Sequence, residues 1–124
     1  MSPIQIEQVT LDNGLRVNLA PDPSTPIVAV NLWYGVGSRN ERPGKTGFAH
    51  LFEHMMFEGS LNIPKGLHWE LVERAGGSMN ASTWFDRTNY FSRPAELIIG
   101  KHCLAVFGDF MIRGILFQEP SKLK

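Results

Sequence analysis

Alternating apolar and polar positions near the start of the chain predict a β-hairpin. Residues 4–11 and 15–20 each alternate well enough for a strand, and Asp12-Asn13-Gly14 between them supplies the left-handed backbone that a tight turn needs. Residues 27–34 are rich in β-branched and aromatic side chains and are apolar on both faces. They predict a third strand that is buried on both sides.

Helical spacing marks the next two segments. Thr46 can cap a helix that runs to about Glu58, and Gly59 would end it. Over residues 67–75 apolar side chains recur every four residues, and Gly76-Gly77 can then form a left-handed helix end. Two short helices are therefore expected after the third strand.

Two short strands and the start of another helix complete the pattern. Residues 78–83 and 88–92 are typical of strands, and Pro94 suits the first turn of a helix. The predicted order is β-β-β-α-α-β-β-α. Because strands and helices come in separate runs, the predicted fold class is α+β, with a mostly antiparallel sheet and helices packed on one of its faces.

The segment with most chemical content is His50-Leu51-Phe52-Glu53-His54. On a helix, His54 falls roughly 40° to one side of His50 and Glu53 roughly 60° to the other, so the three side chains share one wedge. The apolar residues of this helix form an arc on the other side: Phe48, Leu51, Phe52, Met55 and Met56. The arc is expected to pack on the sheet and to hold the polar wedge outward.

Two histidines and a glutamate in this order suit a metal-dependent hydrolase. Neutral imidazole nitrogens are common zinc ligands, and a catalytic zinc ion lowers the pKa of a water molecule that occupies its open position. His50 and His54 are therefore candidate zinc ligands, with Glu53 as the base that takes the proton of this water. The alternative is two exposed helix histidines beside an ordinary charge. His68 and His102, outside the motif, are predicted to be surface or boundary histidines.

Length and charge narrow the classes of protein to consider. A chain of 124 residues suffices for one modest domain. Its 12 Lys plus Arg balance its 12 Asp plus Glu, so it lacks the basic excess that is typical of nucleic-acid binders. The lone cysteine, Cys103, cannot form an internal disulfide. No signal peptide or long apolar span is recognisable, so a soluble protein of the cytoplasm or periplasm is expected, with no membrane span.

The surroundings of the motif resemble the pitrilysin/insulinase family of zinc metallopeptidases, which includes mitochondrial processing peptidase. The similar stretches are residues 35–41, 44–60, 76–83 and 86–90, together with the first hairpin over 10–17. They occur in the family's order, and the resemblance covers about residues 8–97. It implies a zinc-dependent metalloendopeptidase in which His50 and His54 bind Zn²⁺ and Glu53 is the catalytic base.

The resemblance also implies parts that this sequence lacks. The family's third zinc ligand is a glutamate roughly 75 residues beyond the motif, which would fall past Lys124. Glu119 comes too early in the chain, and its setting does not resemble the ligand-bearing helix. The family's domains are longer and work as pairs that enclose a chamber, so a second homologous half or subunit, or self-association, is expected to complete an enzyme.

Residues 1–124 are accordingly interpreted as one partial N-terminal peptidase domain. Residues 98–124 depart from the resemblance, since this stretch is mostly apolar, is interrupted by glycines and follows no clean amphipathic face. An ordinary buried helix is the alternative for it. A hypothesis from a different functional class is a catalytically incomplete fragment or metal-binding module that lacks the third zinc ligand.

A peptide substrate is expected to lie along residues 78–83. Asn80, Ala81 and Ser82 offer little side-chain bulk, so their backbone could pair with an extended peptide added at a sheet edge. The family resemblance of this segment implies the same role. The alternative is a strand that is only solvated or paired with residues 88–92.

Overall fold

A computed structural model describes residues 4–60 and 62–93 of the chain. The predicted helix from Pro94 and the tail over 98–124 lie outside the described residues, as do His102, Cys103 and Glu119. No helix of the described part is long and apolar enough to cross a membrane.

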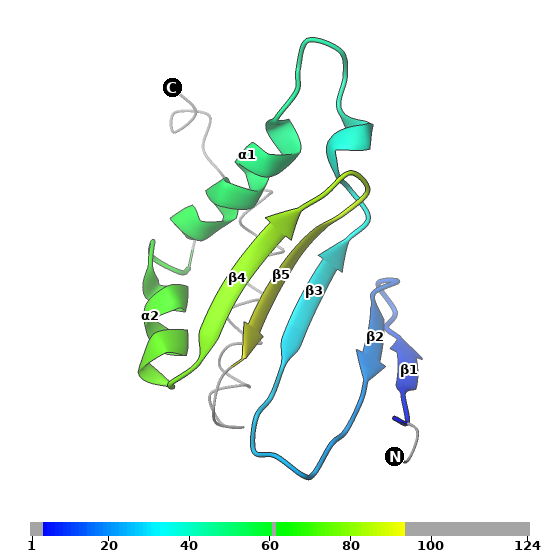
Figure 1. The fold of residues 1–124 in the computed structure, drawn as a ribbon, viewed down its shortest axis with the longest axis vertical. Coiled ribbons are helices and arrows are strands. Elements are labelled where there is room, and N and C mark those ends of the chain that lie inside the picture. The colour runs from blue at the N-terminus through cyan, green and yellow to red at the C-terminus, as the bar shows by residue number, and fades with distance from the viewer. Residues whose placement is uncertain (1–3, 61, 94–124) are drawn as a thin grey trace.

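The described residues form two antiparallel sheets and two α-helices, which confirms the α+β class (Figure 1). The elements in chain order are β1 (Glu7–Thr10), β2 (Arg16–Leu19), β3 (Val30–Tyr34), the 3₁₀ turn η1 (Ser38–Asn40), α1 (Phe48–Met55), the 3₁₀ turn η2 (Met56–Glu58), α2 (Leu67–Arg74), β4 (Ser78–Thr83) and β5 (Thr88–Arg93). Strands β1 and β2 pair with each other, and the second sheet has the order β3-β5-β4.

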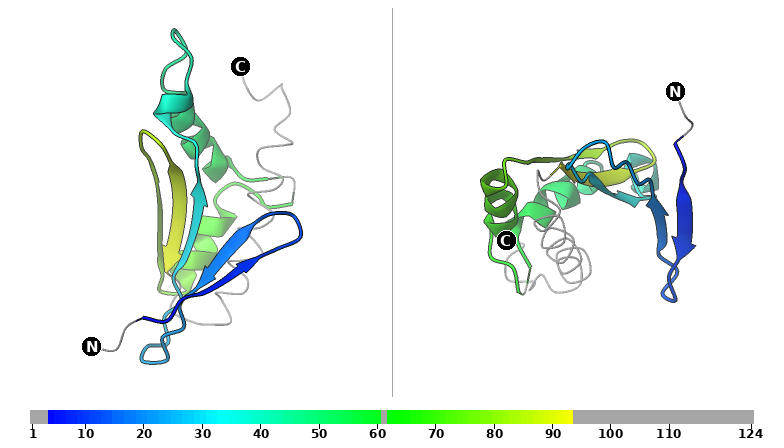
Figure 2. Two further views of the ribbon diagram at one scale, coloured as in Figure 1. Left: turned by 90° about the vertical axis from the view of Figure 1, so that its right-hand side faces the viewer. Right: turned by 90° about the horizontal axis from the view of Figure 1, so that it is seen from below.

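The first hairpin turns where the sequence predicts. Gly14 has a φ of 84°, its amide donates to the carbonyl of Leu11 at 2.8 Å, and the Asn13 side chain accepts from the Leu15 amide at 3.0 Å. The strands are shorter than predicted, and most of their residues are exposed. Figure 2 shows this hairpin standing apart from the three-stranded sheet.

Strand β3 is buried on one face only, which corrects the prediction of a strand buried on both. It begins at Val30 rather than at Ile27, and Ile27 is 55% exposed. Trp33 is 59% exposed, whereas Leu32 and Tyr34 pack on the core. The reason is that α1 and α2 cover a single face of the sheet, so alternate side chains of β3 point away from them (Figure 2).

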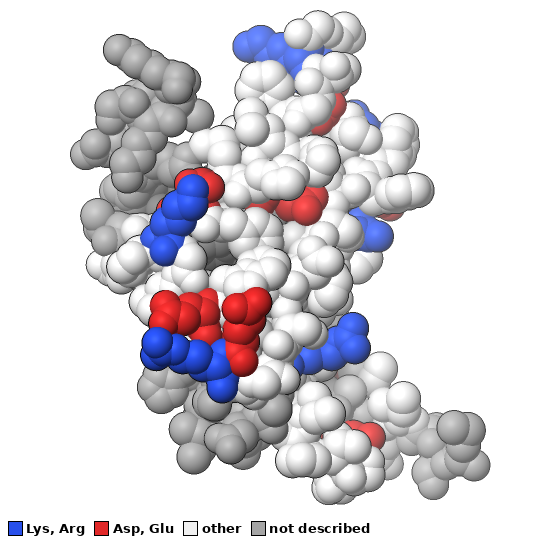
Figure 3. Space-filling view, turned by 60° about the vertical axis from the view of Figure 1, so that its left-hand side comes forward, with Lys and Arg blue, Asp and Glu red and all other residues white. Residues whose placement is uncertain are grey.

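The core lies between the helices and the covered face of the sheet. Met56 and Tyr90 form its centre, and a neighbouring cluster joins Val72 of α2 to Met79 of β4. Phe57 packs against both clusters, so the turn after α1 ties the two helices to one sheet. Positive and negative side chains lie together on the face shown in Figure 3. Ion pairs join Lys65 to Glu58 and Arg74 to Glu70.

Helix α2 ends as predicted, but His68 is buried rather than a surface or boundary residue. Gly76 has a φ of 66°, and the amides of Gly76 and Gly77 donate to carbonyls of the last helical turn. His68 is only 6% exposed. It lies one turn before Val72, so the helix face that packs on β4 carries the imidazole into the interior.

Candidate metal and peptide site

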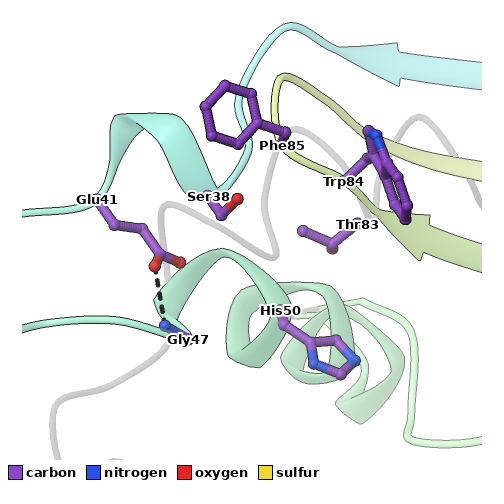
Figure 4. Close-up of a pocket in the computed structure, with 7 residues that line it drawn as sticks. All are labelled: Ser38, Glu41, Gly47, His50, Thr83, Trp84 and Phe85. Carbon is purple, nitrogen blue, oxygen red and sulfur yellow. Dashed lines mark hydrogen bonds between the residues drawn. The ribbon is translucent and has the colours of Figure 1, made fainter.

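The N-terminus of α1 is held by a carboxylate from the preceding loop. Glu41 accepts hydrogen bonds from the amides of Gly47 (Figure 4) and Ala49, both at 2.9 Å. These two bonds, that from Ala49 foremost, lower the pKa of Glu41. Gly47 is the N-cap residue, with a φ of 88°, and makes no capping bond of its own, so the prediction that Thr46 caps the helix is wrong. These hydrogen bonds thus fix the position of the N-terminus of α1, the helix that carries His50, Glu53 and His54.

His50 and His54 present their ring nitrogens to each other on α1. Their Nε2 atoms are 3.0 Å apart, and both side chains are exposed. Two imidazole nitrogens this close together are the kind of pair that would hold one zinc ion. The two imidazoles therefore fit a single zinc ion.

Glu53 lies on the inner side of α1 and is 7% exposed. Its Oε2 atom accepts a hydrogen bond from the Thr83 hydroxyl at the end of β4, and its backbone carbonyl accepts from the Tyr90 hydroxyl at 3.4 Å. The polar wedge of the helix therefore faces the sheet at Glu53 and solvent at the histidines.

This orientation corrects the prediction that the apolar arc of α1 packs on the sheet. Phe48, Leu51 and Phe52 are between 45% and 53% exposed, and of the arc only Met56, beyond the end of α1, is buried. The helix is rotated because its contacts to β4 and β5 are made on the Glu53 side, through Thr83 and Tyr90. A buried acid on the packing face was not expected from a wheel that assigns charge to solvent.

Tyr90 keeps its proton in this environment. Burial raises the pKa of its phenol above the ordinary value, and the carboxylate of Glu53 and the neighbouring Tyr34 raise it further. The hydroxyl is therefore a donor to the Glu53 carbonyl over the physiological pH range. This contact fixes the backbone of the turn that carries Glu53.

An open cleft of about 380 Å³ adjoins His50 (Figure 4). It is lined by Ser38, Glu41, Gly47, His50, Thr83, Trp84 and Phe85. Trp84 and Phe85, in the turn between β4 and β5, are 67% and 63% exposed. The sequence prediction missed these residues, although two adjacent aromatics in a predicted turn are a signal for binding.

Strand β4 is an edge of its sheet within the described residues, with β5 on its other side. The Ala81 amide donates to the Asn80 side chain at 2.8 Å, so it points away from the ladder with β5. Ser82 differs, since its hydroxyl donates to Asn89 and accepts from Arg87. The structure therefore brings the Ala81 amide to the open edge, whereas the Ser82 side chain belongs to a polar network with β5.

A third metal ligand is not among the described residues. No three His, Cys, Asp or Glu side chains in residues 4–60 and 62–93 converge closely enough to hold a metal ion. Within these residues, His50 and His54 thus form a pair that no third such side chain joins.

Comparisons with known proteins give a consistent result. The sequence profile of the family described as Insulinase (Peptidase family M16) matches residues 16–119. The chain is 42% identical over 106 residues to the zinc protease PqqE of Helicobacter pylori, an alignment that covers 85% of this chain and 24% of that protein. It is 34% identical over 110 residues to a probable mitochondrial-processing peptidase subunit beta of Arabidopsis thaliana, covering 89% and 20% respectively.

The fold is similar to that of a protease from Helicobacter pylori whose crystal structure is known. The TM-score is 0.85 at 38% sequence identity, and the match covers 96% of this chain and 28% of that one. The chain thus spans about a quarter of the length of the relatives that it matches.

Proposed function

Because this chain belongs to the insulinase family (peptidase family M16), we propose that it carries the zinc-binding and proton-transfer residues of a metalloendopeptidase. The family is the one that the sequence resemblance implied. Relatives named as zinc proteases support the metal, and the observation that carries the proposal is the 3.0 Å separation of the His50 and His54 Nε2 atoms beside Glu53. Two converging imidazoles next to a buried acid are better explained by a hydrolytic role of this helix than by a purely structural one.

In this proposal the two histidines and the glutamate of α1 have different roles. His50 and His54 hold Zn²⁺, which when bound acidifies water and polarises a peptide carbonyl. Glu53 accepts a proton from the attacking water as its oxygen bonds to the carbonyl carbon. Glu53 then returns that proton to the amide nitrogen as the carbon–nitrogen bond breaks, so one water and one peptide bond give a carboxyl and an amine.

The peptide is proposed to lie along the open edge of β4. Asn80, Ala81 and Ser82 would contact it, with the outward amide of Ala81 as a backbone donor. Main-chain pairing gives affinity without strict sequence preference. The Thr83 end of this strand adjoins the cleft that also includes His50, which supports a peptide path toward the histidines.

A complete enzyme is proposed to need more than these 124 residues. The relatives are several times longer, and one of them is named as a subunit. A second homologous half or subunit, or a second copy of this chain, would then enclose the peptide. The second candidate function, a metal-binding module without turnover, is favoured by the absence of a third ligand from the described residues.

Peptide hydrolysis in a chimaera would separate the two candidates. The chain replaces the corresponding segment of the Helicobacter pylori zinc protease, and cleavage of a quenched fluorescent peptide is measured with zinc bound. The chimaera should cleave the peptide, and Glu53→Gln should lose at least about 100-fold in rate while keeping its zinc, since the amide cannot take a proton. A Glu53→Gln chimaera as active as its parent would eliminate Glu53 as the base, and a parent chimaera without activity would favour the metal-binding module.

A further inference from the structure

Among the described residues, the carboxylate of Glu53 has one hydrogen-bond partner, and that partner is on another element. Its Oε2 atom accepts from the Thr83 hydroxyl, while among the described residues Oε1 accepts from none. The side chain is 7% exposed, so water does little to orient it. The single bond from β4 therefore sets the direction in which this acid points.

The direction of the proton in this bond follows from the neighbouring threonine. Thr88 lies across the strand pair from Thr83, and its hydroxyl lies 3.0 Å from the Val36 carbonyl oxygen and 3.4 Å from the Thr83 hydroxyl, so the carbonyl is its nearer acceptor. A carboxylate only accepts, and each hydroxyl carries one proton. The proton of Thr83 therefore points to Glu53, and that of Thr88 points to the backbone.

The strand end that carries Thr83 is itself held firmly. In the register of β4 and β5, Thr83 faces Thr88 and Ser82 faces Asn89. Arg87 donates to both Ser82 and Asn89, at 2.8 and 2.7 Å, and accepts from the Trp84 amide through its carbonyl at 2.8 Å. The hairpin, not the helix, thus determines where the hydroxyl lies.

We propose that Thr83 is a positioning residue for Glu53, holding Oε2 from β4 so that Oε1 remains free to accept a proton from water. The inference rests on the proposed role of Glu53 as the base and extends it to a residue with no role so far. Because β4 is also the strand proposed to pair with the peptide, one rigid element would set both the peptide and the base. A shift of the strand would then misalign the two together.

Nuclear magnetic resonance on the intact 124-residue chain tests the contact without any need for turnover. The side-chain carboxyl ¹³C resonance of Glu53 is compared among the parent, Thr83→Val, Thr83→Ser and Thr88→Val. Thr83→Val should shift it, Thr83→Ser should restore the parent position, and Thr88→Val should leave it in place. An unshifted resonance in Thr83→Val, or an equal shift in Thr83→Ser, would overturn the proposal.

A measurement on the unaltered chain covers the case in which Thr83→Val does not fold. The hydroxyl proton of Thr83 should exchange slowly with water and should show a nuclear Overhauser effect to the Glu53 side chain. Rapid exchange without that effect would overturn the proposal as well.

Peptide hydrolysis by the chimaera tests whether the positioning by Thr83 affects catalysis. Thr83→Val should lower kcat about tenfold with KM nearly unchanged, and Thr83→Ser should recover most of the loss, because only the alignment of the base is disturbed. Equal kcat in Thr83→Val and parent would overturn the positioning role while leaving Glu53 as the base. Full activity in Glu53→Gln would instead remove the proposed function itself, so the two failures are distinguishable.

Discussion

At the scale of single residues, the helices carry two buried polar side chains, Glu53 and His68, whose surroundings differ. Glu53 is buried beside Thr83, a residue that lines the same cleft as His50. His68 is buried under α2, at a distance from that chemistry, and burial lowers the pKa of its imidazole to about 4. Glu53 is proposed to move a proton, whereas His68 stays neutral in the folded protein at neutral pH.

The lowered pKa of His68 predicts that the free energy of unfolding decreases as the pH decreases. The unfolded imidazole binds a proton below about pH 6.5, whereas the folded one resists protonation down to about pH 4. Stability should therefore be full above pH 6.5 and fall by about 1–2 kcal/mol by pH 5. Urea unfolding at pH 7 and pH 5 measures this difference. In His68→Gln the pH dependence should be flatter, and an equally steep fall in that variant would assign the effect to other groups.

The sequence selected His50, Glu53 and His54 as candidates and placed both histidines toward solvent, where they lie, but it placed Glu53 on the wrong side of the helix. Residue types and their spacing along α1 were sufficient to select them. Periodicity alone placed Glu53 toward solvent, because a wheel cannot register a hydroxyl that arrives from β4 30 residues later. His68 was misplaced for a similar reason, since the packing of α2 on β4 decides which of its faces is inside.

At the scale of elements, short-range signals predicted well and long-range partners did not. The turns at Gly14 and Gly76 and the bounds of β4 follow from local backbone requirements, which the sequence displays directly. The start of α1 does not, because its cap is the carboxylate of Glu41, six residues before Gly47. Thr46 satisfied the local rule and was wrong.

The loop before η1 predicts a steric contrast between two glycines. A Cβ atom on Gly37 would lie 2.3 Å from the Trp84 carbonyl oxygen and 2.7 Å from the Arg87 amide nitrogen, whereas one on Gly35 meets nothing within 4 Å. Gly37→Ala should therefore lose about 1–3 kcal/mol of unfolding free energy. Gly35→Ala, the matched control, should change it by less than about 0.5 kcal/mol. Equal unfolding midpoints for the two variants would show that η1 does not pack on the β4–β5 turn in this way.

The outward amide of Ala81 predicts a backbone contribution to peptide binding. Ala81→Pro removes this donor without removing a hydrogen bond of the β4–β5 ladder, so the chain should fold and keep its zinc while binding an extended peptide more weakly. Loss of one such bond should weaken binding about tenfold. Fluorescence anisotropy of a labelled peptide measures it, with Ala81→Gly, which keeps the donor, as the control. Unchanged affinity in a folded Ala81→Pro variant would rule out strand addition at this edge.

At the scale of the whole molecule, the chain corresponds to part of a larger architecture. It spans between 20% and 28% of the three relatives compared, and within its described residues it provides two histidines that are proposed as zinc ligands and one acid that is proposed as the base. Two ligands bind zinc more weakly than three, so the tight site of a working enzyme is expected to need a further ligand from outside residues 4–93. The family resemblance gives the same expectation, with a glutamate roughly 75 residues beyond the motif as the further ligand.

The most direct test of the account is a zinc titration of the purified 124-residue chain by calorimetry. The parent should bind one Zn²⁺ per chain, and Glu53→Gln should bind it with similar affinity, since the acid is proposed as a base and not as a ligand. His50→Ala combined with His54→Ala should abolish this binding, because both imidazoles that converge at 3.0 Å are removed. Unchanged zinc affinity in the double variant would contradict the metal site on which the proposed function depends.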